Sequence, residues 1–165
     1  MPALTSSPAP VYLDHAATAP VDPAVAARMA EVLALPPGNA SAAHAAGRAM
    51  LGIIEAARAD VAGLAGAAPA EVVFTSGATE SNNLAITGTA LAALAAARGT
   101  RPHLVTLATE HKSVLEPVRA LGAQGCDVTL LKPDAGGRLA PDALAAALRP
   151  ATCLVSLMHV NNETG

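Results

Sequence analysis

The stretch that decides the fold occupies residues 71–83 and reads Glu-Val-Val-Phe-Thr-Ser-Gly-Ala-Thr-Glu-Ser-Asn-Asn. A short apolar run, residues 72–75, leads through a Ser-Gly turn directly into a helix start. In such a unit the free N–H groups of the first helical turn lie at the positive end of the helix dipole. The stretch therefore predicts a phosphate-binding site, to which the hydroxyls of Ser76 and Thr79 can add donors. The alternative is an ordinary turn in which Ser76 caps the helix.

Apolar runs and helical segments alternate along the chain. We expect strands at residues 72–75, 104–108, 128–131 and 153–158, and helices at 79–97, 113–124 and 141–148. This alternation is typical of a three-layer αβα fold with a mainly parallel sheet, because parallel strands need crossover connections. The strands are continuous apolar runs, as expected where helices cover both faces of the sheet.

Upstream of this pattern the sequence predicts two helices and a short extended segment at residues 11–13. Asp22 followed by Pro23 is a helix start, and the helix should reach about residue 35. A second helix, with apolar residues at three- and four-residue spacing, should run from near His44 to Gly66. Farther along, Ser113 with Glu116 resembles a capping box, and Gly99 and Gly125 stand where helix C-caps are expected.

Composition narrows the functional classes. The 165 residues are 52% hydrophobic, enough for about one domain with a buried core, and residues 1–10 are expected to be a flexible tail. A net charge of -3, with Tyr12 and Phe74 as the aromatic residues, argues against nucleic acid and anionic membrane as partners. Cys126 and Cys153 lack metal-site or disulfide spacing, so we expect small core residues. No signal peptide or membrane span is recognisable, which favours a cytoplasmic protein.

Polar clusters follow three of the expected strands, at residues 76–79, 109–112 and 159–163. Ligands of open α/β sheets bind at the carboxyl ends of the strands. Neither GxGxxG nor a P-loop is present, so the first cluster suits a single phosphate. His111 could be a solvated turn residue and Asn161-Asn162 a turn pair. Taken with the phosphate site, an imidazole and an amide facing a phosphorylated aromatic ligand is the interpretation we favour.

Several motifs together resemble those of cysteine desulfurases, which are fold-type-I enzymes of the class V aminotransferase family that use pyridoxal 5'-phosphate (PLP). The motifs are Tyr-Leu-Asp-His-Ala-Ala-Thr at 12–18, Gly38-Asn39 followed by His44, Phe-Thr-Ser-Gly-Ala-Thr-Glu-Ser-Asn-Asn at 74–83, Glu-His-Lys at 110–112, and Met-His-Val-Asn-Asn-Glu-Thr-Gly at 158–165. The resemblance runs from residue 11 to 165 and is greatest to the branch that serves nitrogenase and general iron–sulfur cluster assembly. His15, Ala40 and Thr164 depart from residues that are common in the family.

The resemblance implies roles for particular residues. Ala78 and Thr79 would hold the PLP phosphate, His111 would stack on the ring and assist proton transfer, and Asn162 would bind the phenolic oxygen. No metal is implied. The implied activity converts L-cysteine to L-alanine and an enzyme persulfide, supplying sulfur for iron–sulfur clusters. A homodimer and a sulfur-acceptor scaffold protein are the implied partners.

By the same resemblance, the Schiff-base lysine and the nucleophilic cysteine would follow Gly165, as would the pyridine-binding Asp and the substrate-binding Arg. Residues 11–165 are thus expected to be the N-terminal part of the PLP-binding domain, inactive alone. Lys112, Cys126 and Cys153 do not match the missing catalytic positions. The alternatives are another class V enzyme, such as a selenocysteine lyase or an aminotransferase of small amino acids, and a non-catalytic half-domain that binds a partner subunit.

Overall fold

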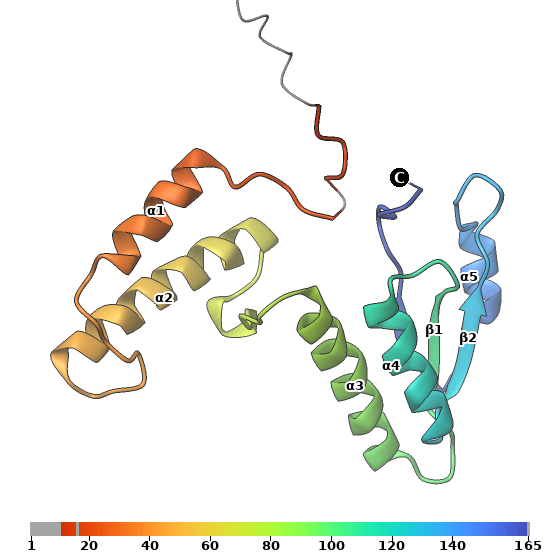
Figure 1. The fold of residues 1–165 in the computed structure, drawn as a ribbon. Coiled ribbons are helices and arrows are strands. Elements are labelled where there is room, and N and C mark those ends of the chain that lie inside the picture. The colour runs from red at the N-terminus through yellow and green to blue at the C-terminus, as the bar shows by residue number, and fades with distance from the viewer. Residues whose placement is uncertain (1–10, 16, 165) are drawn as a thin grey trace, which may run out of the picture. The chain divides into compact units, whose positions relative to one another are not determined.

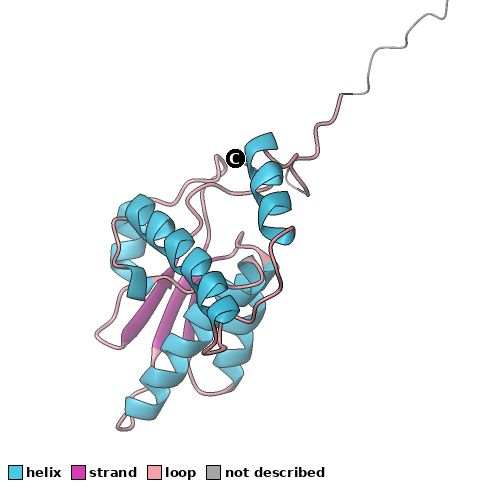
Figure 2. Ribbon diagram, turned by 90° about the vertical axis from the view of Figure 1, so that its left-hand side faces the viewer, coloured by secondary structure: helices cyan, strands magenta, loops and turns pink. Residues whose placement is uncertain are grey.

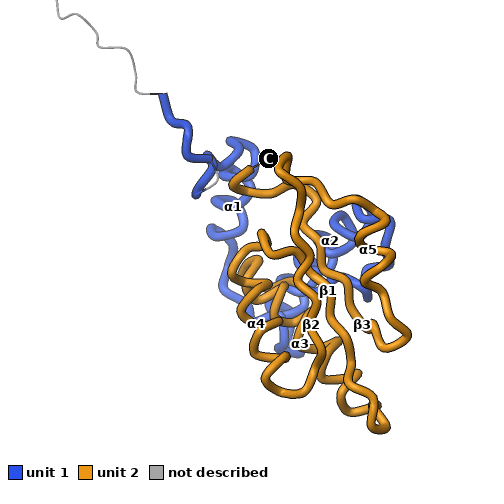
Figure 3. Tube along the Cα trace, turned by 90° about the vertical axis from the view of Figure 1, so that its right-hand side faces the viewer, with its two compact units in different colours: residues 1–73 blue, residues 74–165 orange. Residues whose placement is uncertain are grey.

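The computed structural model of the protein describes residues 11–15 and 17–164. The chain forms two compact units, Met1–Val73 and Phe74–Gly165, which Figure 3 colours separately. The predicted tail at residues 1–10 lies outside the described residues. In the described part of the chain, no helix is long and apolar enough to cross a membrane.

The first unit contains the two helices predicted upstream. Helix α1 spans Pro23–Leu33, and its N-cap Asp22 accepts the N–H of Ala24 through Oδ1 at 2.8 Å. Helix α2 spans Ala45–Ala65 and ends at Gly66, whose φ of 65° is the left-handed conformation that favours glycine at a helix end. Both helix predictions are confirmed. A short 3-10 helix, η1 (Pro69–Glu71), follows, whereas residues 11–13 form no strand.

The loop before α2 gives structural roles to two residues of the family-like motifs. The ring of His44 caps α2, with Nδ1 accepting the N–H of Gly47 at 3.3 Å. Asn39 holds the loop in a turn by accepting the N–H of Ser41 at 2.9 Å. A Cβ at Gly47 would collide with the carbonyl oxygens of Ala42 and Asn39, so this close approach requires glycine.

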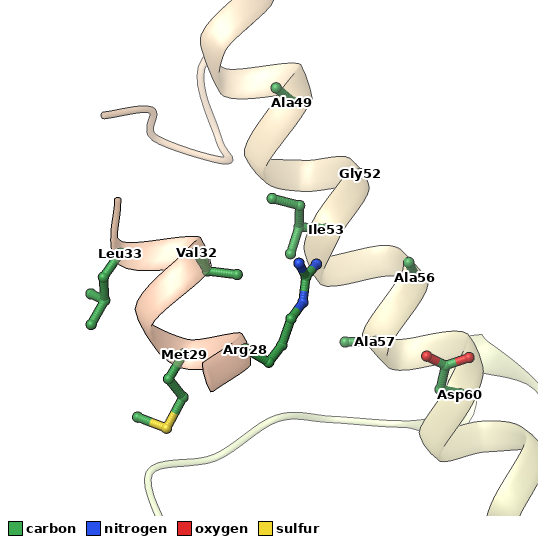
Figure 4. Close-up of a pocket in the computed structure, with 10 residues that line it drawn as sticks. All are labelled: Arg28, Met29, Val32, Leu33, Ala49, Gly52, Ile53, Ala56, Ala57 and Asp60. Carbon is green, nitrogen blue, oxygen red and sulfur yellow. The ribbon is translucent and has the colours of Figure 1, made fainter. Parts of the chain in front are cut away.

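An apolar groove of 760 Å³ lies between α1 and α2 (Figure 4). Met29 and Val32 line it from α1, and Ile53 and Ala57 from α2. Among the described residues of this unit only Gly47 and Ala62 are buried. The unit therefore has little core of its own, and its apolar helix faces remain accessible.

The second unit is built on a parallel sheet of three strands (Figure 2). Strands β1 (His103–Leu107), β2 (Asp127–Leu131) and β3 (Thr152–Ser156) lie in the order β2-β1-β3. Helices α3 (Ala78–Ala96) and α4 (Lys112–Ala123) pack together on one side of the sheet, and α5 (Pro141–Ala147) lies on the other side (Figure 1). The αβα arrangement and the parallel sheet are confirmed.

The core of this unit lies between β1 and the helix pair α3–α4. Its buried members are Ile86, Ala90, Leu104, Val114, Val118, Leu121 and Cys126. All five residues of β1 are buried because this central strand has neighbours on both edges and helices over its faces. Cys126 is the small core residue that the sequence predicts, and the partly buried Cys153 packs against the same cluster.

Three local predictions are wrong. Residues 72–75 form no strand, because no strand of the described sheet pairs with them. Ser113 is not a cap: α4 begins one residue earlier, and Glu116 pairs with Arg119 at 2.6 Å instead. Helix α3 ends at Ala96, so Gly99 turns the following loop rather than capping the helix.

The C-cap prediction for Gly125 is confirmed. Its φ is 117°, and the next N–H, that of Cys126, bonds back to the carbonyl of Leu121 at 3.0 Å. This bond closes a Schellman motif, which satisfies carbonyls at the end of α4. The motif also turns the chain directly into β2.

One buried side chain joins all three strands at the amino end of the sheet. His103 of β1 is fully buried, with Nδ1 2.8 Å from Oγ1 of Thr152 and Nε2 2.8 Å from Oγ1 of Thr129. These hydroxyls belong to β3 and β2. The imidazole therefore crosslinks the sheet at the end opposite the polar clusters.

Candidate functional site

The start of α3 presents hydrogen-bond donors without partners. The N-cap Gly77 contributes no side-chain cap. Within the described residues, the N–H groups of Ala78, Thr79 and Glu80 and the hydroxyl of Thr79 make no hydrogen bond. A Cβ at Gly77 would contact nothing within 4 Å, so the space beside the turn is open. These donors, at the positive end of a 19-residue helix, suit an oxyanion.

Ser76 does not take either role predicted for it. Its N–H and its hydroxyl both donate to Oε2 of Glu80, at 2.7 and 2.6 Å. The hydroxyl and the N–H of Ser76 hold the pKa of the Glu80 carboxyl below its ordinary value. Because Glu80 reaches back over one helical turn, Ser76 neither caps α3 nor offers its hydroxyl to a ligand.

His111 is the N-cap of α4, and its ring has a defined tautomer. Nδ1 accepts the N–H of Ser113 at 3.1 Å and lies 2.8 Å from Oγ of Ser113. A ring nitrogen that accepts an N–H carries no proton, so the proton of the neutral imidazole resides on Nε2. Asn82 of α3 donates to Oγ of Ser113 at 2.8 Å and thereby ties the cap of α4 to α3.

An open groove of 580 Å³ brings two predicted site residues together. Thr79 and Asn83 line it from α3, and His111 and Ser113 from the start of α4. Ala78 is not among the lining residues, although its N–H precedes that of Thr79. The groove is thus lined both by Thr79, with its unpartnered donors, and by His111.

Asn161 and Asn162 follow β3 and have different partners. Asn162 donates its amide N–H to Oε1 of Glu163 at 2.9 Å, and it does not line the groove. Asn161 points back into the unit, where its Nδ2 donates to the carbonyl of Thr109 at 2.9 Å. Among the described residues, the amide of Asn162 makes no bond to the segment that carries His111, and it does not line the groove with Thr79.

Glu110, immediately before His111, is a residue to which the sequence alone assigned no separate role. It is 7% exposed, and its Oε1 accepts the N–H of Met158, two residues after the end of β3. Burial raises the pKa of the Glu110 carboxyl, and the bond from Met158 partly offsets that rise. The sequence did show an acidic residue beside a candidate histidine. It could not show the partner of Glu110, because Met158 lies 48 positions away.

Comparison with known proteins shows which family this chain belongs to. The family model described as Aminotransferase class-V matches residues 11–165. This chain belongs to the class-V aminotransferase family. The resemblance to cysteine desulfurases is likewise confirmed. The chain is 51% identical over 157 residues to "Cysteine desulfurase IscS" of Anaeromyxobacter sp. (strain K), and 49% identical over 160 residues to the protein of the same name from Pseudomonas syringae pv. tomato.

Solved structures agree with these sequence relatives. The class-V chain matches "SspA in complex with cysteine" with a TM-score of 0.84 and 42% identity over 92% of its length. It matches DndA from Streptomyces lividans with a TM-score of 0.79 and 45% identity over 94%. This chain covers 43% of the SspA chain and 42% of the DndA chain. In the comparison with the two IscS relatives, 94% of this chain is aligned, but it spans only 38% of their length.

Proposed function

We propose that this chain supplies the phosphate-binding and ring-facing part of the PLP site of a cysteine desulfurase. The observation that carries the proposal is the groove that is lined both by Thr79, whose donors are unpartnered, and by His111, whose ring is oriented by Ser113. The IscS relatives support cysteine desulfurase over a selenocysteine lyase or an aminotransferase. L-cysteine is the proposed substrate, which is supported by the solved complex of the relative SspA with cysteine.

The donor set fits the cofactor's phosphate. A phosphate monoester accepts several hydrogen bonds and carries negative charge, and the start of α3 offers backbone N–H groups, the hydroxyl of Thr79 and a favourable dipole. We assign Ala78 and Thr79 to the phosphate, His111 to the ring face and Asn162 to the phenolic oxygen. When bound, PLP supplies an electron-withdrawing ring that weakens bonds to the α-carbon of the amino acid.

His111 is the residue that we assign to proton transfer. Nδ1 is occupied by Ser113, which leaves the Nε2–H as the available donor of the neutral ring. In the proposed reaction the C–S bond of L-cysteine breaks, an S–S bond forms with an enzyme thiolate, and a proton reaches the β-carbon to give L-alanine. We assign that thiolate and the Schiff-base lysine to the part of the relatives' length that this chain does not span.

The two cysteines of this chain are poorly placed to be that nucleophile. Cys126 is 2% exposed, and burial raises the pKa of its thiol, which disfavours the reactive thiolate. Cys153 lies within β3 and contacts the carbonyl of His103.

By family resemblance, we further propose a cytoplasmic homodimer that passes sulfur to a scaffold protein for iron–sulfur clusters.

We expect the purified 165-residue chain to release neither sulfide nor alanine from L-cysteine in the presence of PLP. The physical reason is that neither thiol is placed to attack and Lys112 begins α4 beside His111 rather than at a Schiff-base position. The measurement is sulfide and alanine production against a PLP-only control. Sustained turnover above that control would show that the chain contains a complete catalytic site.

Replacing Thr79 with valine should weaken binding of the phosphate by roughly 1.5–3 kcal/mol, because a hydroxyl donor to a charged acceptor is lost. The probe is 4'-deoxypyridoxine phosphate, which carries the ring and phosphate but has no aldehyde to react with lysine amines. Binding is followed by the NMR shifts of the Thr79 and Glu80 amides. Thr79→Ser keeps the hydroxyl and is the matched control. If the Val and Ser variants bind the probe with equal affinity, the hydroxyl of Thr79 does not bind the phosphate.

A further inference from the structure

Two loops carry the ring-facing residues of the proposed site. His111 ends the loop after β1, and Asn162 lies in the turn after β3. Both loops leave the same edge of the sheet because β1 and β3 are neighbouring parallel strands. A ring that both residues contact requires these loops to keep a fixed spacing.

Glu110 provides the first connection between the loops. Its carboxylate crosses from the β1 loop to the N–H of Met158 and is buried. No ion pair to Glu110 occurs among the described residues. A buried carboxylate with one backbone donor and no cation is unfavourable for stability. The burial of Glu110 is therefore better explained by its bond to the loop after β3 than by a contribution to folding stability.

Asn161 provides the second connection, in the opposite direction. Its Nδ2 donates to the carbonyl of Thr109, two residues before His111. Its Oδ1 accepts the N–H groups of Glu163 and Thr164, at 2.8 and 3.1 Å, and so shapes the turn that contains Asn162. One side chain thus fixes the turn and attaches it to the other loop.

We propose that Glu110 and Asn161 are positioning residues, which together hold the loop of His111 against the turn of Asn162. This inference rests on the proposed PLP site for its purpose, but the attachment itself is a property of the loops. Each connection runs from a side chain of one loop to the backbone of the other, so either loop loses support when the other is altered. The phosphate donors of α3 are not part of this arrangement.

The variants separate charge, shape and connection. Asn161→Asp keeps Oδ1 for the turn and removes the N–H donor to Thr109. Glu110→Ala removes the acceptor for Met158. Glu110→Gln keeps an acceptor of the same length without the charge and is the matched control. Amide hydrogen exchange in the 165-residue chain is measured across both loops, together with thermal unfolding.

The expected result is reciprocal loosening. Exchange should accelerate about fivefold or more at residues 109–111 in Asn161→Asp and at 158–162 in Glu110→Ala, because each lost hydrogen bond had restrained the opposite loop. Glu110→Gln should change exchange by less than about twofold, since its amide oxygen still accepts the N–H of Met158. Loosening confined to the substituted loop, or equal in all three variants, would overturn the proposal.

Binding distinguishes this inference from the proposed function. Inorganic phosphate should bind all variants as it binds the wild type, whereas 4'-deoxypyridoxine phosphate should bind Asn161→Asp and Glu110→Ala about tenfold more weakly, because ring contacts depend on loop spacing. Parallel losses for both probes, or none for either, would contradict a positioning role. If the wild type binds neither probe, the proposed PLP site fails, and the exchange data alone decide whether the two side chains join the loops.

Discussion

Replacing His111 with asparagine should lower turnover on the order of 10²-fold or more, the usual loss when an acid–base group is removed. The experiment uses an enzyme in which this chain is joined to the remaining length of an IscS relative. Asparagine is chosen because His111 also caps α4, where Nδ1 accepts the N–H of Ser113. Asparagine is a good N-cap without a titratable ring, so the helix keeps its cap while proton transfer is lost.

The proposed phosphate donors of α3 are unaffected by this change, since they belong to the backbone of Ala78 and to Thr79. Phosphate binding should therefore persist, and the absorbance of the bound cofactor should shift as its ring loses the imidazole. His111→Ala is the comparison variant. Its turnover should fall as far as that of His111→Asn, and its free energy of unfolding should also fall by about 0.5–2 kcal/mol because the helix cap is missing. If the Asn variant has normal turnover and a normal absorbance spectrum, His111 only caps α4 and takes no part in proton transfer.

Local sequence patterns predicted much of this fold because their causes are local. Asp22 with Pro23 starts α1, Gly66 ends α2, and Gly125 turns α4 into β2, each through contacts within a few residues. The parallel sheet followed from the alternation of apolar runs with helical segments. The same local reasoning predicted an oxyanion site at the start of α3, where the N–H groups of residues 78–80 have no hydrogen-bond partner among the described residues.

The failures came from partners that the sequence pattern does not reveal. Residues 72–75 have strand composition, but a strand exists only where another strand pairs with it, and the described sheet provides none. Ser76 binds Glu80 because the carboxylate reaches back along the helix. Ser113 was expected to cap α4, yet the histidine two residues earlier performs that role.

Distant partners explain what was missed in the candidate site. Glu110 binds a backbone N–H 48 positions away, and Asn161 binds a carbonyl 52 positions away. Backbone acceptors and donors are present at every position, so no side-chain pattern identifies which one will be used. Thr79 and His111 could be named because their residue types and their places after strands already suggested chemistry. Whether Asn162 contacts the cofactor stays a prediction.

His103→Leu should lower the free energy of unfolding by roughly 2–4 kcal/mol, because two half-buried hydroxyls lose their ring partners. Those hydroxyls belong to Thr129 and Thr152, so the loss affects all three strands. Urea unfolding measures it. Adding Thr129→Val to His103→Leu should recover part of the loss, since removing both polar partners costs less than leaving one unsatisfied. No recovery would mean that the leucine disturbs packing instead.

The same residue gives the protein a defined pH dependence. Burial lowers the pKa of His103, the nearby cation Arg149 lowers it further, and Asp127 opposes them. Above an unfolded-state pKa of about 6.5 the imidazole is neutral in both states, and its contribution to stability is complete. As the pH falls below that value the unfolded chain takes up the proton first, so stability is lost until the pH reaches the lower folded-state pKa.

Other groups also titrate in this range, and the raised pKa of the Glu110 carboxyl acts with the opposite sign: its destabilising effect diminishes as the pH falls through its folded-state pKa. The informative quantity is therefore the difference in unfolding free energy between the wild type and His103→Leu, measured from a pH of about 7.5 downward. That difference should be largest above a pH of about 6.5 and shrink below it. A constant difference would show that His103 is protonated equally in the folded and unfolded chains. A difference that shrinks would establish a neutral imidazole as the crosslink of this sheet.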